Sequence, residues 1–137
     1  MIFLDTNIFM YAAGDQHSNK DNSVKILELV AMNEIQTAIN VEVIQEVLHR
    51  YTHIGEKSEG IKLAEYISCL MDTIYSVEMI DMKEAIKILH KFDVTSRDAI
   101  HAASCKNRGI KKICTYDRHF HKIKFLSVIK PAEILKK

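Results

Sequence analysis

The sequence has few of the residues that interrupt or cross-link a chain. Its 137 residues include four glycines, one proline, three cysteines and no tryptophan. So little glycine and proline excludes a collagen-like or loop-dominated protein and predicts long helices. The odd number of cysteines argues against a disulfide framework and predicts reduced thiols in the cytoplasm, with Cys69, Cys105 and Cys114 packed in the core.

Strong net charge and long apolar runs are missing as well. The 19 basic and 18 acidic residues leave a formal charge of +1, so any site for a polyanion has to be a local patch. No run approaches the about 18 apolar residues of a membrane span, and Asp5 interrupts the apolar start before a signal peptide can form. With 47% hydrophobic and 27% charged residues, the composition predicts an intracellular soluble protein, with one globular domain over residues 1–137.

Apolar residues recur at helical spacing in five segments, and short apolar runs lie between them. Pro131 suits the first turn of a further short helix, Gly109 suits the end of the fifth helix, and 55–60 is expected to be an exposed turn. The predicted helices centre on 24–31, 43–51, 61–71, 82–89 and 99–103, and the predicted strands are 1–4, 37–39, 74–80, 113–115 and 126–129.

This alternation of strands and helices predicts an α/β fold. The expected architecture is a three-layer sandwich with a central parallel sheet of about five strands and helices on both faces. In such a sheet, ligands bind beyond the carboxyl ends of the strands, where the strand order reverses. The residues that follow the predicted strands are therefore the first candidates for a site.

Four acidic residues lie where this rule directs attention. Asp5 follows the first strand, Asp117 follows the fourth, Glu46 lies in the helix after the second, and Asp98 lies in the first turn of the fifth helix. Two carboxylates about 5 Å apart repel by about 3 kcal/mol at an effective dielectric of about 20, so such a cluster normally holds a hard cation. Oxygen ligands favour magnesium or manganese over zinc.

Each acid also has a purely structural interpretation. An acid after a strand is often a turn former, and an acid in a first helical turn is often a capping charge. Glu46 has Glu42 four residues before it and Arg50 four residues after it, which is also the spacing of a solvated, salt-bridged helix face. The spacing by itself leaves both interpretations open.

Histidines and basic stretches near the acids are weaker candidates. His101 lies three residues after Asp98 on one helix face and could hold a water or a phosphate, although a buried structural histidine is the commoner case. His119 and His121 have the alternating spacing of a metal pair without a third soft ligand, which favours a surface loop. The basic stretches 106–112 and 118–124 could contact phosphates, but charge runs are also typical of a solvated face.

The acids and their neighbours together resemble the PIN domain family. The resemblance covers essentially the whole chain, and the compact size is similar to VapC-type toxins and their stand-alone prokaryotic relatives. Its first and third motifs are fairly specific, whereas the second is not. The motifs are Asp5-Thr6-Asn7, Glu46-Val47-Leu48, Ser96-Arg97-Asp98-Ala99-Ile100-His101-Ala102-Ala103 and Thr115-Tyr116-Asp117.

The resemblance implies a ribonuclease that hydrolyses RNA by in-line attack and leaves a 5′-phosphate and a 3′-hydroxyl. It implies that magnesium or manganese lowers the pKa of a bound water and neutralises the phosphate. Many relatives have a further aspartate where this chain has His119, which removes a fifth acidic ligand. The implied metal ligands are Asp5, Glu46, Asp98 and Asp117, with support from Thr6, Asn7 and Thr115 and RNA contacts from Arg50, Arg97 and Lys122.

The resemblance also implies partners. A toxin of this type would be silenced by a small antitoxin whose apolar helix lies in a groove and whose basic side chain enters the acidic site. It would also form a homodimer. An RNA-processing nuclease outside a toxin–antitoxin pair is the alternative role for the same chemistry.

Two other functions compete with a nuclease. The start of the chain is similar to haloacid-dehalogenase-type phosphatases, in which the aspartate after the first strand is the nucleophile, but those enzymes need an aspartate where this chain has Asn7. A PIN-like scaffold could instead bind RNA or protein without catalysis. The presence of all four acids argues against that module.

Overall fold

The computed structural model describes residues 1–136, and in these residues a parallel sheet of five strands forms the centre. Its strand order is β3-β2-β1-β4-β5, and every neighbouring pair is parallel. The order reverses between β1 and β4, because the chain moves outward from β1 to β3 and then returns. The strands are β1 (Ile2–Leu4), β2 (Thr37–Asn40), β3 (Ile74–Tyr75), β4 (Lys112–Cys114) and β5 (Ser127–Ile129).

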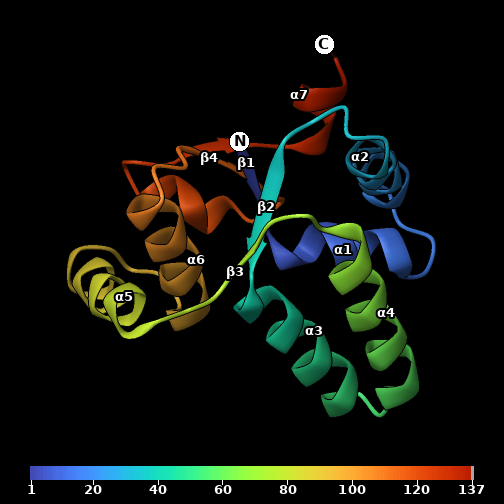
Figure 1. Cartoon of the computed structure of the whole chain (residues 1–137), viewed down its shortest axis with the longest axis horizontal. Coiled ribbons are helices and arrows are strands. Elements are labelled where there is room, and N and C mark those ends of the chain that lie inside the picture. The colour runs from blue at the N-terminus through green and yellow to red at the C-terminus, as the bar shows by residue number, and fades with distance from the viewer. Residues whose placement is uncertain (137) are drawn as a thin grey trace.

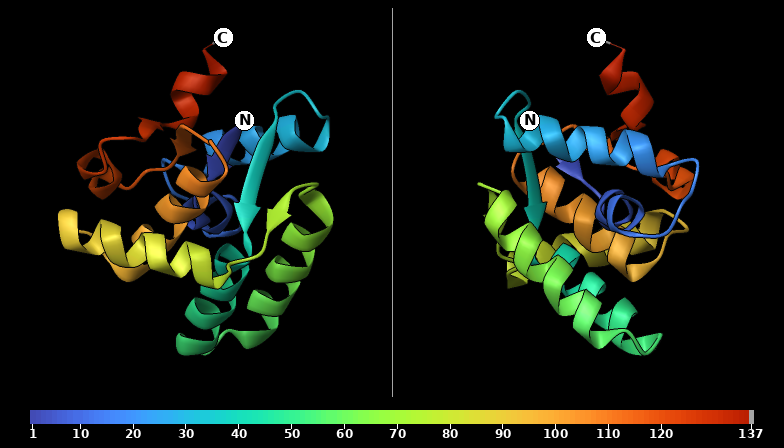
Figure 2. Two further views of the ribbon diagram at one scale, coloured as in Figure 1. Left: turned by 60° about the vertical axis from the view of Figure 1, so that its left-hand side comes forward. Right: turned by 90° about the vertical axis from the view of Figure 1, so that its right-hand side faces the viewer.

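Helices cover both faces of the sheet, which confirms the predicted three-layer α/β fold. In Figure 1, α5 and α6 lie together on one side of β2, and α1 and α2 lie on the other. Figure 2 shows α3 and α4 running side by side past the end of the sheet. The helices are α1 (Thr6–Ala13), α2 (Lys20–Ala31), α3 (Val41–His53), α4 (Lys57–Leu70), α5 (Met79–Lys91), α6 (Ser96–Asn107) and α7 (Pro131–Leu135), with a 3₁₀ turn η1 (Arg118–Lys122).

None of the helices within residues 1–136 is both long and apolar enough to cross a membrane. The apolar side chains gather instead in one core between the layers. Phe3 and Leu4 of β1 point to opposite faces and are both fully buried, as expected for a central strand covered on two sides.

Helix α6 carries a candidate acid, and its sequence explains both of its ends. The Thr95 side chain accepts a hydrogen bond from the backbone N–H of Asp98 and so caps the first turn. Gly109 has a φ of +70°, and the N–H of Ile110 donates to the carbonyl of Cys105 at 2.9 Å. This Schellman-type end confirms the stop predicted at Gly109. Buried alanines between the two ends let α6 pack closely.

One predicted strand was wrong in extent, and one helix was not predicted. The strand predicted over 74–80 comprises only Ile74–Tyr75, because a capping box between Glu78 and Asp81 begins α5 at Met79. Helix α1 was not predicted at all. It begins directly after Asp5, whose carboxylate accepts the N–H of Thr6, so the segment after the first strand is helical.

Three further predictions about buried and exposed residues were wrong, because packing against a neighbouring helix decides which face of a helix is buried. The predicted turn at 55–60 is shorter, since Gly60 lies buried inside α4 against Tyr51 of α3. Cys69 is exposed and is not a core thiol, whereas the other two cysteines are buried. Some apolar residues that were predicted to face the core from these helices are exposed instead, namely Ile61, Ile86 and Leu89.

Candidate metal centre

The four predicted acids line one cavity at the carboxyl ends of the central strands. Asp5 follows β1 and Asp117 follows β4, while Glu46 comes from α3 and Asp98 from the first turn of α6. The cavity has a volume of about 490 Å³. It lies beside the point where the strand order reverses, as expected for a ligand site in an open parallel sheet.

Hydrogen bonds hold both carboxylate oxygens of the buried Asp5 in place. One carboxylate oxygen accepts the N–H of Thr6 at 2.8 Å, and the other accepts the hydroxyl of Thr115 at 2.7 Å. The Asn7 amide donates to the Thr115 oxygen at 3.2 Å. The three residues that the family resemblance implied as supports, Thr6, Asn7 and Thr115, therefore all lie beside the acids. Burial raises the pKa of Asp5, and the positive character of His101 only partly opposes this effect.

Glu46 pairs with a buried histidine. The Nε2 atom of His101 lies 2.6 Å from the Glu46 carboxylate, and the Thr6 hydroxyl donates to the same oxygen at 3.0 Å. Burial acts to raise the pKa of Glu46, but these contacts outweigh it and hold the pKa below its usual value. Burial acts to lower the pKa of His101, and the bond to Glu46 and the charge of Asp5 raise it instead. The pair therefore behaves as an internal ion pair.

His101 is the residue whose importance sequence reasoning underestimated. Its side chain is 1% exposed, and its Nε2 atom also lies 3.8 Å from Asp5. Its Nδ1 atom is buried and has no hydrogen-bond partner among residues 1–136. The available signal was its place three residues after Asp98 on α6, because residues at that spacing share a helix face.

Asp98, Asp117 and His119 form a second group at the same cavity. Burial first, and then repulsion from Asp117 and Asp5, raise the pKa of Asp98 to about 6. His119 is exposed on η1, as the surface placement predicted, but its Nδ1 atom lies 2.9 Å from Asp117. His121 is exposed on the same turn. Sequence reasoning missed the contact between His119 and Asp117, which depends on the tight turn at η1.

The donor groups fit a divalent cation. In each of the two triplets Asp5–Glu46–His101 and Asp98–Asp117–His119, potential ligand atoms lie within 4.8 Å of one another. Within residues 1–136, no lysine or arginine nitrogen lies within 4.0 Å of these four carboxylates. Carboxylates that converge with no lysine or arginine this close to them suit a hard cation.

The predicted RNA-contact residues do not all lie at this cavity. Arg50 and Arg97 line it, whereas Lys122 binds the carbonyl of Asp93 at 3.0 Å and is not among its lining residues. Glu42 lies one helical turn from Glu46 and is half-buried, but it does not line the cavity. Of the two glutamates, only Glu46 lies at the cavity, so it stays the predicted ligand on α3.

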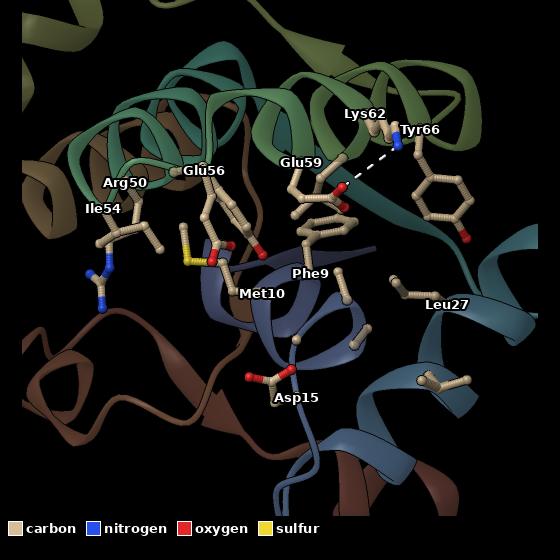
Figure 3. A pocket seen from close by; sticks show the side chains of 16 residues that line it. Phe9, Met10, Asp15, Leu27, Arg50, Ile54, Glu56, Glu59, Lys62 and Tyr66 are labelled. Atoms are coloured by element: carbon tan, nitrogen blue, oxygen red, sulfur yellow. Dashed lines mark ion pairs between the residues drawn. The ribbon is translucent and has the colours of Figure 1, made fainter.

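A larger groove, lined by both apolar and charged side chains, lies next to the acidic cavity. It has a volume of about 810 Å³ and separates α1 and α2 from α3 and α4. Figure 3 shows Phe9 and Leu27 on one side and Tyr66 on the other, with Glu56 and Glu59 also among the side chains that line the groove. Met10 and Arg50 line both cavities, so the groove continues into the acidic site.

A parallel sheet with acids clustered at its switch point defines the chain as an α/β domain with a candidate metal site. The PIN domain family model matches residues 2–126. The chain is 32% identical over 118 residues to Ribonuclease VapC23 of Mycobacterium tuberculosis, which covers 85% of this chain and 93% of that protein. It is 28% identical over 141 residues to Ribonuclease VapC2 of Methanocaldococcus jannaschii, covering 93% and 92%. The chain therefore belongs to the PIN domain family, as its motifs indicated.

Solved structures share the fold. VapC20 of Mycobacterium tuberculosis, described as a toxin that cleaves the sarcin–ricin loop, superposes with a TM-score of 0.75 at 14% identity, covering 92% of this chain and 97% of that one. VapBC2 of Rickettsia felis, bound to a promoter DNA fragment, gives a TM-score of 0.73 at 20% identity, covering 95% and 98%. At these identities the likeness concerns the fold.

Proposed function

We propose that this chain is a metal-dependent endoribonuclease, with residues 1–137 as one nuclease domain, and that it acts in the cytoplasm as the toxin of a toxin–antitoxin pair. The observation that carries the proposal is the convergence of four acids in one cavity, with no lysine or arginine nitrogen of residues 1–136 within 4.0 Å of them. The curated relatives named as VapC ribonucleases support the reaction class.

Asp5, Glu46, Asp98 and Asp117 would hold magnesium or manganese. When bound, such an ion would neutralise charge on the scissile phosphate. It would also make hydroxide available from water near neutral pH. Thr115 fixes the Asp5 carboxylate, while Thr6 and His101 fix that of Glu46. These bonds hold the acids in place before RNA binds, so little reorganisation is needed.

Arg50 and Arg97 line the cavity and would bind the RNA backbone on either side of the cut. Lys122 is a more distant candidate for the same role, since its amine is bound to the carbonyl of Asp93.

The groove would hold a helix of a small antitoxin protein. Because Met10 and Arg50 line both the groove and the acidic cavity, a helix in the groove could place a basic side chain among the acids. Exposed apolar residues on α5, among them Met79, Ile80 and Ile86, would form the interface of a homodimer.

The direct experiment is cleavage of a labelled RNA pool by the purified protein with MnCl2, with MgCl2 and with EDTA. We expect 5′-phosphorylated products with either metal and none with EDTA. Intact RNA with both metals would contradict the ribonuclease proposal, and RNA binding without cleavage would favour a binding module.

A further inference from the structure

Two histidines lie on one exposed face at the end of α3. His49 and His53 are four residues apart, so their side chains project from the same side of the helix, one turn apart. Both residues are exposed, and their ring centroids lie 6.1 Å apart, with the ring planes inclined by 16°. Neither residue lines the acidic cavity or the groove, so the pair is separate from the candidate metal centre.

No ion pair engages these two rings. Among the histidines of residues 1–136, only His101 and His119 have a ring nitrogen within 4.0 Å of a carboxylate oxygen. Arg50 follows His49 in the sequence, but it lines the two cavities. Exposed side chains change rotamer on a fast timescale, so the ring nitrogens of His49 and His53 can turn toward a common point.

The spacing of the two rings suits one transition-metal ion. A zinc–nitrogen bond measures about 2.1 Å, so two imidazoles on one ion have ring centres roughly 5–6 Å apart, close to the separation of this pair. Two histidines four residues apart on a helix can bind one zinc ion from the same face. Imidazole nitrogens suit zinc, copper and nickel, whereas magnesium and manganese prefer carboxylates such as those of the acidic cavity.

The end of the helix also favours a cation at this position. His53 is the last residue of α3, and the N–H of Ile54 donates to the carbonyl of Arg50 at 3.2 Å, so the last turn stays helical. The carbonyls at the end of a helix carry partial negative charge, which stabilises a positive ion bound beside them.

We propose that His49 and His53 form a surface site for one zinc, copper or nickel ion, with water in the remaining coordination positions. This inference does not depend on the proposed ribonuclease function. The bound ion would join two successive turns of α3. It would thereby hold the end of the helix that contributes Arg50, Tyr51 and Ile54 to the groove.

Titration of the full, untagged chain with ZnCl2, followed by calorimetry, tests the site. Excess MgCl2 in the buffer competes for the acidic cavity, because magnesium favours carboxylates over imidazoles. The variants are His49→Gln and His53→Gln, and the matched control is His90→Gln, which changes an exposed histidine on α5. Thermal melts confirm that each variant is folded.

A further variant tests the spacing of the histidines and keeps their number. The double change Leu48→His with His49→Gln places the two histidines five residues apart, on different sides of α3. Leu48 is an exposed residue, so this change leaves the core intact.

The wild type should bind one zinc ion that His49→Gln and His53→Gln bind at least about tenfold more weakly. The double variant should bind it as weakly as the single variants, and His90→Gln should bind like the wild type. In the same buffer, ZnCl2 should raise the Tm of the wild type and of His90→Gln more than that of the other variants, because the ion binds the folded chain.

Equal zinc affinity in the wild type, His49→Gln and His53→Gln would overturn the site, because the ion would then bind elsewhere on the chain. Wild-type affinity in the double variant would also overturn it, since each imidazole would then act alone and the helical spacing would not matter.

Discussion

His101 shows how one buried side chain organises the acidic site. Its Nε2 atom contacts Glu46 at 2.6 Å, and Asp5 lies at 3.8 Å. Two acids drawn to one imidazole repel each other less, so they can remain close before a cation binds. A histidine in this position therefore explains how a metal-free acid cluster can be part of a stable fold.

The choice between two glutamates on α3 can be tested directly. Glu46 lines the acidic cavity and Glu42 does not, although they are one turn apart. Glu46→Gln should lower RNA cleavage by about 100-fold or more, because an amide is a poor ligand for a hard cation. The matched change Glu42→Gln should retain most of the rate.

Rates for both variants come from cleavage of a labelled RNA in MnCl2. Comparable losses in the two proteins would mean that the charge of the α3 face, and not ligation by one residue, supports cleavage.

Asp98 should make the metal-free protein less stable as the pH rises. Its folded pKa is about 6, above the value of about 3.9 for an unfolded chain. The folded state thus binds the proton more tightly, and its contribution to the free energy of unfolding falls between about pH 4 and pH 6. In EDTA, Asp98→Asn should abolish this fall, which is on the order of 2 kcal/mol.

Urea unfolding at pH 4.5 and pH 7 measures the effect as the difference between wild type and variant. The control is Asp72→Asn, an exposed aspartate outside the acidic cavity. An identical pH dependence in wild type and Asp98→Asn would show that Asp98 carries no strain in the folded protein.

At the scale of elements, specific contacts join two pairs of helices, α5 with α6 and α3 with α4. Arg108, just beyond α6, binds the fully buried Asp81 of α5 at 2.8 Å and lies over the ring of Tyr75 at 4.7 Å. The hydrogen bond from Arg108, with further bonds from the Glu78 N–H and the Asn107 amide, outweighs burial and lowers the pKa of Asp81 to about 2. The pair α5–α6 thereby fixes the helix that carries Asp98.

The crossing of α3 and α4 depends on Gly60. A Cβ atom at this position would lie 2.5 Å from the Cβ of Tyr51, which has no freedom to move away. Gly60→Ala should lower the free energy of unfolding by about 1–2 kcal/mol, because overpacking exceeds the gain in helix propensity. Glu65→Ala, at an exposed position of the same helix, should have little effect.

Chemical unfolding of both variants provides the measurement. A more stable Gly60→Ala protein would mean that α3 and α4 can separate at low cost, and that their packing does not fix the position of Glu46.

At the scale of the whole molecule, metal binding should stabilise the fold, since the proposed ligands come from α3, α6 and the segments that follow β1 and β4. Manganese at about ten times its dissociation constant should add about 1.4 kcal/mol to the free energy of unfolding of the wild type. For a domain of this size that corresponds to a rise of about 4 °C in Tm.

Asp5→Asn should lose most of this rise, because one ligand charge is removed from the centre of the cluster. Thermal melts of both proteins in EDTA and in MnCl2 decide the question. An equal rise in the two proteins would exclude Asp5 as a metal ligand. His121→Ala, an exposed change on η1, is the control and should respond like the wild type.

The sequence alone predicted the class of fold, and it singled out the four acids that the structure brings to one cavity. Short apolar runs between helical stripes can be buried only as strands of a covered parallel sheet, and the acids follow those strands at positions that a sheet brings to one edge. The family motifs carried the same information for Asp5, Asp98 and Asp117. Local signals were also sufficient for Thr95 and Gly109, because capping depends on neighbours in the chain.

Only the tertiary structure decided which faces and contacts matter. The burial of Gly60 depends on the approach of another helix, and the pairing of His101 with Glu46 joins residues 55 positions apart. Tyr11 and Tyr116 meet for the same reason, since α1 and the segment after β4 lie side by side at the cavity. Sequence periodicity specifies a local conformation, whereas such contacts depend on the packing of elements that are distant in the chain.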